Sequence, residues 1–200
     1  MPIIIAVFIA YLFGSISSAI VVCKIMGLPD PRTEGSQNPG ATNVMRIGGK
    51  KAAAITLAGD VLKGIIPVLL ARWYGLDSVV LASVAFAAFV GHLYPVFFHF
   101  KGGKGVATLL GCLIGLSLMT AVAWGVTWLI VARISRYSSL ASLSASALAP
   151  LYIWGITSNP IYAASVSLMT LLLFYRHRSN ITKLIAGTES KLGEKKECFY

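Results

Sequence analysis

The stretch VATLLGCLIGLSLMTAVAWGVTWLIVA, residues 106–132, decides the fold, because 27 consecutive positions carry no charged side chain. A membrane-spanning helix needs about 20 apolar residues, within a range of about 17–25. The stretch is therefore long for one helix and short for two. Whether it crosses a bilayer once or twice determines the side on which every later residue lies.

The composition of the whole chain is that of an integral membrane protein. Of its 200 residues, 56% are hydrophobic and 12% are charged, and the mean hydropathy is +0.78. Soluble domains carry about 25% charged residues. We predict one all-α transmembrane domain over residues 1–200, with a polar tail from about residue 187. The candidate spans are 2–23, 52–71, 79–99, 106–132, 139–157 and 160–175. The first of these is interpreted as a retained span and not as a signal peptide.

The positions of lysine and arginine favour two crossings within residues 106–132. With a break near Met119–Trp124, 15 of the 17 basic residues fall on one face, leaving Arg72 outside and Lys63 inside a span. A single crossing would move Arg133, Arg136 and the basic tail to the opposite face. Because basic loops stay on the cytoplasmic side, we predict about seven short helices, an outside N-terminus and a cytoplasmic C-terminus.

The net charge of +10 has an ordinary explanation in such a protein. Basic loops orient the spans and lie near anionic headgroups, so the charge does not indicate nucleic acid. It also favours an anionic substrate. The three cysteines form neither a disulfide framework nor a zinc pattern, and Cys23 and Cys112 are expected to be packing residues. The seven acidic residues form no cluster typical of a metal site, so no metal is expected.

Three polar segments, the first two rich in glycine, interrupt the apolar sequence, and the predicted topology brings all of them to the cytoplasmic face. They are Gly35-Ser-Gln-Asn-Pro-Gly-Ala-Thr-Asn43 with Arg46, then Lys101-Gly-Gly-Lys-Gly105, then Arg176-His-Arg-Ser-Asn180. Glycine lets a backbone wrap closely around a ligand. Cationic side chains, hydroxyls and free N–H groups suit oxyanions. We therefore predict a phosphate-binding site at this surface, with substrate contacts from the first two segments.

The first two segments each have a simpler alternative. Asn38-Pro39 is typical of an N-cap followed by proline, with a helix from about Gly40, and could be an ordinary helix cap. The lysines and glycines of 101–105 precede a helix starting near Val106, where the helix dipole favours anions, but could form a plain positive-inside hairpin. The spacing of a Walker A loop is absent.

The remaining polar groups are less specific. Residues 133–142, which include Arg133 and Ser142, could bind substrate or serve only to orient the spans. If helical, His177 and Asn180 share one face, and His177 is the best candidate for a pH-active group or for a hydrogen-bond partner on the alkoxide side of the reaction. Glu189 could bind substrate or form an ion pair.

Three further polar residues lie in apolar sequence and are interpreted as structural. Asp60 and Lys63 lie inside a span at i, i+3, where we predict a buried pair that locks helices, with a catalytic role as the alternative. His92 is expected to orient the loop that follows it, and His99 to have no specific role.

The segments together resemble the bacterial acyl-phosphate:glycerol-3-phosphate acyltransferases, the PlsY family. The resemblance includes Gly91-His92 through Pro95 to the Lys101–Thr108 segment, Arg136-Tyr-Ser-Ser-Leu-Ala-Ser142 and Gly187-Thr-Glu189, and it covers almost the whole chain. One departure is Gln37, which stands where the family commonly has glycine and so disfavours a turn with positive φ.

The resemblance implies an enzyme of phospholipid synthesis in the bacterial cytoplasmic (inner) membrane, acting as a monomer among membrane lipids without a cofactor. It would transfer a fatty acyl group from acyl phosphate to the 1-hydroxyl of glycerol 3-phosphate, giving lysophosphatidate and phosphate. The expected catalytic residues are Ser36, Lys104, His177 and Asn180. The expected substrate-binding residues are Gly35, Asn38, Gly40, Thr42, Asn43, Arg46, Gly102, Gly103, Arg133, Ser142 and Glu189.

Acyl phosphate is already activated, so positioning and charge stabilisation matter more than a protein nucleophile. We expect direct attack by the glycerol hydroxyl, with Lys104, Ser36 and the Gly102 and Gly103 amides holding acyl phosphate. Arg46, His177 and Asn180 would position glycerol phosphate, assisted by Ser142. The proton would pass to the departing phosphate, with His177 as general base the rival.

Two other classes of function remain open from the residues alone. A transporter or channel for organic phosphates would also use basic loops and broken helices. It would be expected to show an internal repeat or polar residues through the membrane, and only Asp60 and Lys63 lie at depth. The second alternative is a lipid-binding scaffold without turnover.

Overall fold

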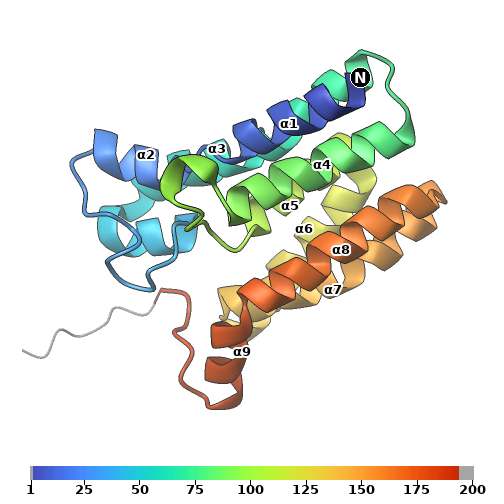
Figure 1. The fold of residues 1–200 in the computed structure, drawn as a ribbon. Helices are drawn as coiled ribbons and strands as arrows, with labels where there is room; N and C mark the ends of the chain where they lie inside the picture. Colours follow the sequence, from blue (N-terminus) through green and yellow to red (C-terminus); the bar gives the residue numbers. More distant parts are fainter. Residues whose placement is uncertain (1, 194–200) are drawn as a thin grey trace, which may run out of the picture.

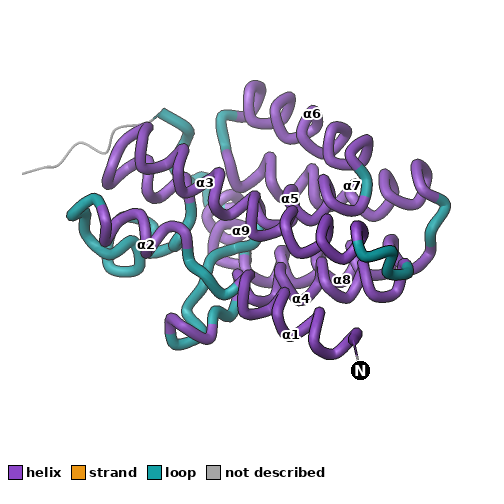
Figure 2. The backbone as a smooth tube through the Cα atoms, turned by 90° about the horizontal axis from the view of Figure 1, so that it is seen from above, coloured by secondary structure: helices purple, strands orange, loops and turns teal. Residues whose placement is uncertain are grey.

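The computed structural model describes residues 2–193, and every regular element within them is helical. The elements are α1 (Pro2–Gly14), α2 (Ser18–Ile25), α3 (Ala41–Trp73), α4 (Ser78–Leu93), η1 (Val96–Phe98), α5 (Val106–Leu116), α6 (Leu118–Ser135), α7 (Ser138–Thr157), α8 (Pro160–Arg176) and α9 (Arg178–Ile185). The long helices run side by side in one bundle (Figure 1). Seen from above, the connecting segments lie at the ends of the helices (Figure 2). Lys195, Lys196 and Cys198, used in the charge and cysteine arguments, lie outside the described residues.

The helices confirm an all-α chain with several membrane-length segments. Within residues 2–193, four helical segments are long and apolar enough to cross a bilayer, namely Ala41–Trp73, Ser78–Phe98, Leu118–Ser135 and Ser138–Thr157. A fifth results if α1 and α2, bent by 41°, form one broken span. The apolar helices α5 and α8 are shorter. The count of seven crossings and their sidedness remain predictions.

The stretch 106–132 does form two helices, but the break lies at Ser117 and not at Met119–Trp124. The break is stabilised by one local hydrogen bond and one from a distant residue. The Ser117 hydroxyl caps α6 by accepting a hydrogen bond from the Thr120 amide at 3.3 Å. Arg72 donates to the Leu116 carbonyl at 2.7 Å, at the end of α5. Together these bonds satisfy backbone groups that a break would otherwise leave exposed to lipid.

The predicted span 2–23 is bent, and one predicted helix cap is wrong. The span consists of α1 and α2, and Lys63 supports the break between them by donating to the Ile16 carbonyl at 2.8 Å. Asn38 is not an N-cap, because α3 begins at Ala41 with Gly40 in the N-cap position. The helix is also longer than the span predicted there, with non-helical backbone at Gly49 (φ 74°).

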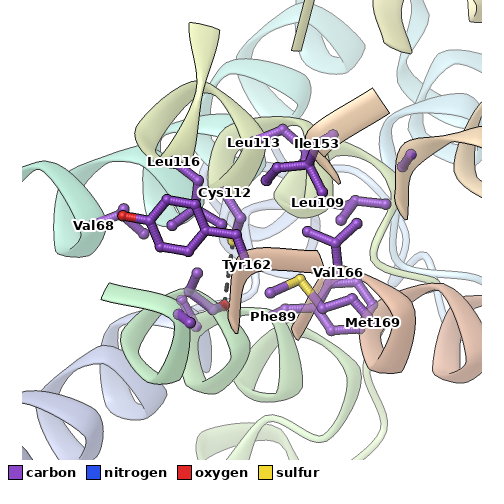
Figure 3. Close-up of a cluster of buried hydrophobic side chains, with 14 of the residues drawn as sticks. Val68, Phe89, Leu109, Cys112, Leu113, Leu116, Ile153, Tyr162, Val166 and Met169 are labelled. Atoms are coloured by element: carbon purple, nitrogen blue, oxygen red, sulfur yellow. Dashed lines mark hydrogen bonds between the residues drawn. The ribbon is translucent and has the colours of Figure 1, made fainter. Parts of the chain in front are cut away.

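The bundle has a densely packed apolar interior. Helices α3 and α5 approach closely at Gly64 and Gly111, where a side chain on either glycine would overlap the backbone of the other helix. Buried side chains from α3, α4, α5, α7 and α8 form the main cluster (Figure 3). Cys23 and Cys112 are buried free thiols, as expected of packing residues. This packing fixes the ends of the helices, and at one of those ends the three polar segments meet (Figure 1).

Candidate functional site

Two adjoining cavities of about 210 and 270 Å³ lie where the three segments meet. The first is lined by Ser36, Gln37, Asn38, Gly102, Lys104, Arg176, Arg178 and Ser179. The second is lined by Arg32, Gln37, Pro39, Phe100, Lys101, Gly102 and Arg176. Gln37, Gly102 and Arg176 belong to both. The structure therefore brings together residues that lie up to 147 positions apart in the sequence, since Arg32 and Ser179 both line this region.

The loop before α3 is held in shape by Asn43, whose side chain is 1% exposed. Its Oδ1 accepts from the Ser36 amide at 2.8 Å, and its Nδ2 donates to the Pro31 and Glu34 carbonyls at 2.9 and 3.0 Å. The side-chain amide of Asn43 thus forms its hydrogen bonds with the backbone of the loop, and through these bonds it holds the loop in the shape that a substrate would meet.

Two positive φ angles give that loop its turn. Gly35 has φ of 62°, and a side chain there would overlap Asn43 Oδ1. Gln37 has φ of 55° although it is not glycine. The positive φ that glutamine disfavours is thus present, and it brings Gln37 to the wall of both cavities.

The glycine loop between η1 and α5 is fixed from two directions. Arg176 donates to the Gly102 carbonyl at 2.7 Å and to the Gly103 carbonyl at 3.1 Å. The Gly103 amide donates to the His92 carbonyl at 3.2 Å. In this structure α4 uses that donor, and a contact between the Gly103 amide and substrate stays a prediction. Arg176 also lies over the Tyr94 ring, 5.5 Å from its centroid.

A set of hydrogen-bonded side chains extends from Lys104 behind the cavity lining. Lys104 Nζ donates to Asn180 Oδ1 at 2.6 Å, and Asn180 Nδ2 donates to Glu189 Oε1 at 2.7 Å. Ser139 Oγ donates to the same Glu189 oxygen at 2.7 Å. Because an ammonium group only donates and a carboxylate only accepts, the two neighbours fix the orientation of the Asn180 amide.

The region is strongly electropositive. Five cationic side chains line the cavities, namely Arg32, Lys101, Lys104, Arg176 and Arg178. Asp30 neutralises only Arg32, at 2.7 Å, and this partner lowers the pKa of the Asp30 carboxyl. Burial lowers the pKa of Lys104 to about 8, an effect that Glu189 opposes and that Lys183, Arg176 and Arg46 reinforce. An anion entering the site would restore the ordinary preference of Lys104 for its charged form.

His177 lies between α8 and α9 and is 3% exposed. Its Nδ1 is 2.8 Å from the Leu173 carbonyl oxygen, and because that oxygen only accepts, Nδ1 carries the proton. Burial lowers the pKa of His177 to about 4, against a smaller opposing effect of the Leu173 carbonyl. The ring is therefore neutral at neutral pH.

The other predicted residues fall into two groups. Gly35, Gly103, Asn43, Asn180 and Glu189 support the lining from behind it through the contacts described above. Gly40 caps α3, and Thr42 and Arg46 are exposed near its start, with Arg46 close enough to influence the pKa of Lys104.

Arg133 is exposed and does not line either cavity. Ser142 accepts from Trp128 Nε1 at 3.0 Å and donates to the Ser138 carbonyl within the α6–α7 pair. Substrate roles for these residues remain predictions.

Sequence reasoning missed several lining residues, chiefly Arg176, Arg178, Ser179, Lys101 and Arg32. The first four belong to polar segments that the sequence analysis had already identified, and their place in those segments was the signal that could have found them.

The ion pair inside α3 was predicted correctly: Lys63 Nζ and Asp60 Oδ1 are 2.9 Å apart and buried. Within residues 2–193, no three His, Cys, Asp or Glu side chains are grouped as a metal site would require.

Comparison with known proteins gives consistent matches over nearly the whole chain. The family model "Glycerol-3-phosphate acyltransferase" matches residues 4–187. A glycerol-3-phosphate acyltransferase of Burkholderia multivorans is 56% identical, covering 98% of this chain and 94% of the relative. One from Thioalkalivibrio sulfidiphilus is 54% identical, covering 93% and 92%.

Two crystal structures are also similar to this chain. Both are of PlsY, described as an integral membrane glycerol 3-phosphate acyltransferase. The glycerol 3-phosphate form is 41% identical with a TM-score of 0.92, and the lysophosphatidic acid form is 40% identical with a TM-score of 0.90. Each match covers 96% of both chains.

Proposed function

The chain belongs to the glycerol-3-phosphate acyltransferase family, and on that premise we propose that it transfers a fatty acyl group from acyl phosphate to the 1-hydroxyl of glycerol 3-phosphate. The products are lysophosphatidate and inorganic phosphate. The observation that carries this proposal is a pair of adjoining cationic cavities that share Gly102 and Arg176. Two phosphate-bearing substrates that react with one another need two such sites side by side.

Acyl phosphate is held by Lys104, Ser36 and the Gly102 amide, with Arg176 close to its phosphate. Lys104 supplies the charge, and Arg176 supplies the planar donor set that suits phosphate oxygens. Glycerol 3-phosphate occupies the second cavity, whose lining includes Arg32 and Lys101. Arg46, His177 and Asn180 position it from outside that lining, with Ser142 assisting. The Lys104–Asn180 hydrogen bond of 2.6 Å joins the two sets of residues, which supports placing the substrates against each other.

The reaction is a direct transfer without an acyl-enzyme. The glycerol hydroxyl oxygen bonds to the acyl carbon, the bond from that carbon to the phosphate oxygen breaks, and the hydroxyl proton passes to the departing phosphate. The cationic groups stabilise the negative charge that develops on the oxygens. With a pKa of about 4, His177 is a poor match for removing a proton near neutral pH, so its role is to orient substrate and not to act as general base.

The enzyme acts as a monomer in the bacterial cytoplasmic membrane, at an early step of phospholipid synthesis. The acyl chain lies between helices in contact with lipid, while both phosphates occupy the glycine-rich surface on the cytoplasmic side. This placement follows the predicted topology, in which basic loops face the cytoplasm.

The test is turnover by the purified, detergent-solubilised protein. We expect lysophosphatidate and phosphate to appear in equal amounts from acyl phosphate and glycerol 3-phosphate, and to be lost in Lys104→Ala. The matched control is Lys50→Ala, which removes an exposed lysine outside the cavity lining. Turnover with an acyl thioester but not with acyl phosphate would refute the proposed donor. Flux of glycerol phosphate across sealed vesicles without any product would indicate a transporter instead.

Two further observations test the mechanism. His177→Gln should retain substantial activity with an unchanged pH profile at neutral pH, whereas a general base would lose nearly all of it. Isolation of a covalent acyl-Ser36 species would refute direct transfer.

A further inference from the structure

A chain of contacts leads from the buried ion pair of α3 to the glycine loop of the site, and His92 stands in its middle. His92 lies in the last turn of α4 and is 6% exposed. Its Nδ1 is 3.6 Å from Asp60 Oδ1. Both atoms are fully buried and have no hydrogen-bond partner among the described residues. Asp60 Oδ1 already has Lys63 Nζ as an ionic partner at 2.9 Å, so the atom left without any partner is His92 Nδ1, and Asp60 Oδ1 is the carboxylate oxygen beside it.

Asp60, the carboxylate that faces His92, is held in place by Lys63. Asp60 Oδ1 is 2.9 Å from Lys63 Nζ, and Lys63 donates to the Ile16 carbonyl at the break between α1 and α2. The two charges neutralise one another in the apolar interior. Asp60 thus presents a fixed acceptor to the imidazole.

On its other side, His92 supports the glycine loop directly. Its carbonyl accepts from the Gly103 amide at 3.2 Å. A side chain on Gly103 would collide with His92 Nε2, and one on Gly102 would collide with the His92 carbonyl oxygen. The loop therefore rests on both the ring and the backbone of His92, and only glycine permits this approach.

Arg176 completes the connection to the cavities. It donates to the carbonyls of both glycines and lines both cavities. A movement of the imidazole would shift the two glycines, and the glycines would shift the guanidinium. Nothing in the transfer chemistry itself requires a histidine at this depth, so a positioning role explains why a polar ring is buried here.

We propose that His92 is a positioning residue for acyl-phosphate binding, in which an Nδ1–H directed at Asp60 fixes the ring against Gly103 and so holds Gly102 and Arg176 in place. This inference rests on the proposed function, because acyl phosphate is the ligand assigned to these groups. The 3.6 Å separation is slightly longer than a hydrogen bond, so the proposal requires the two atoms to move closer together.

The test compares two amides at this position. Asparagine keeps a donor where His92 has Nδ1, whereas glutamine, closer in size to histidine, places its donor where His92 has Nε2. We expect His92→Asn to keep the KM for acyl phosphate within about threefold of wild type, and His92→Gln to raise it about tenfold or more. The kcat should change less than the KM in both variants. The matched control, His99→Asn, changes an exposed histidine and should leave both constants unchanged.

Several outcomes would overturn the proposal. If the site needs only bulk, glutamine will be the milder replacement. If His92→Gln fails to fold while His92→Asn folds, the δ nitrogen serves folding and not the loop. Should both fail to fold, the ¹⁵N spectrum of the wild-type histidines decides, assigned with His99→Asn and His177→Gln: a protonated Nδ1 on His92 supports the proposal and a bare Nδ1 refutes it. Absence of turnover in wild type would instead refute the proposed function, so the two failures are distinguishable.

Discussion

Replacing Glu189 by glutamine should weaken the site by removing the charge that its two hydrogen-bond donors share. Glu189 Oε1 accepts from Asn180 and Ser139, each at 2.7 Å. Glutamine retains an oxygen that can accept, but the charge is lost. Hydrogen bonds to charged groups contribute about 1.5–3 kcal/mol and neutral ones about 0.5–1.5 kcal/mol, so the substitution costs about 1 kcal/mol for each bond. A loss of about 1–2 kcal/mol corresponds to a fall in kcat/KM of about 5- to 30-fold.

The same substitution has a second effect, on pH dependence. Burial already lowers the pKa of Lys104 to about 8, and Glu189 opposes that shift. Removing the carboxylate lowers the pKa of Lys104 further. Because the charged ammonium binds phosphate and is lost as pH rises through this pKa, the alkaline fall in kcat/KM should begin at lower pH in Glu189→Gln than in wild type.

The assay is the initial rate of lysophosphatidate formation across pH values on both sides of 8. The control is Glu34→Gln, which removes the same charge from the loop before α3, where only the Glu34 backbone carbonyl makes a described hydrogen bond. We expect this control to behave like wild type. A fall in activity with no movement of the alkaline limb would show that Glu189 does not act on Lys104, and the reasoning would fail.

Three further substitutions have defined outcomes. Lys104→Arg should remove the alkaline limb near pH 8, because a guanidinium stays charged; a limb that persists in a pH–rate profile would assign it to another group. Asp60→Asn should lower the free energy of unfolding by about 3–5 kcal/mol, because it leaves the Lys63 ammonium buried and unpaired. Thermal melts in detergent should show partial recovery of stability when Lys63→Met is added, and equal melting temperatures of the single and double variants would argue against the pair. Gly35→Ala should cost about 1–2 kcal/mol of loop stability, since φ is 62° and the new methyl group meets Asn43; the expected readout is a raised KM, and an unchanged KM would contradict it.

Features set by local composition could be predicted from the sequence. Uncharged apolar runs identified the helices, and the asymmetry of lysine and arginine indicated that 106–132 forms two of them. The density of glycine with cations identified the segments that line the cavities, including Ser36 and Lys104. In each case the physical cause lies within a few neighbouring residues, which a sequence displays directly.

Features set by distant partners could not be predicted. The break at Ser117 depends on Arg72, which satisfies the Leu116 carbonyl from 44 residues away. The break between α1 and α2 depends in the same way on Lys63. The Gly103 amide donates to the His92 carbonyl, a contact that requires α4 to lie beside the glycine loop. In the sequence Arg176 is only the first residue of a polar segment, since its bonds to the glycine loop form only when α8 lies beside that loop.

The central claim is that segments far apart in sequence meet on the cytoplasmic side and bind phosphate there. It is tested by single cysteines at Gln37, Lys101 and Ser179 in a chain whose Cys198 is replaced by serine, leaving the buried Cys23 and Cys112. A membrane-impermeant maleimide should label all three positions from the cytoplasmic side of sealed membrane vesicles, and glycerol 3-phosphate or inorganic phosphate should slow that labelling. Labelling of Lys101→Cys and Ser179→Cys from opposite sides would contradict the account.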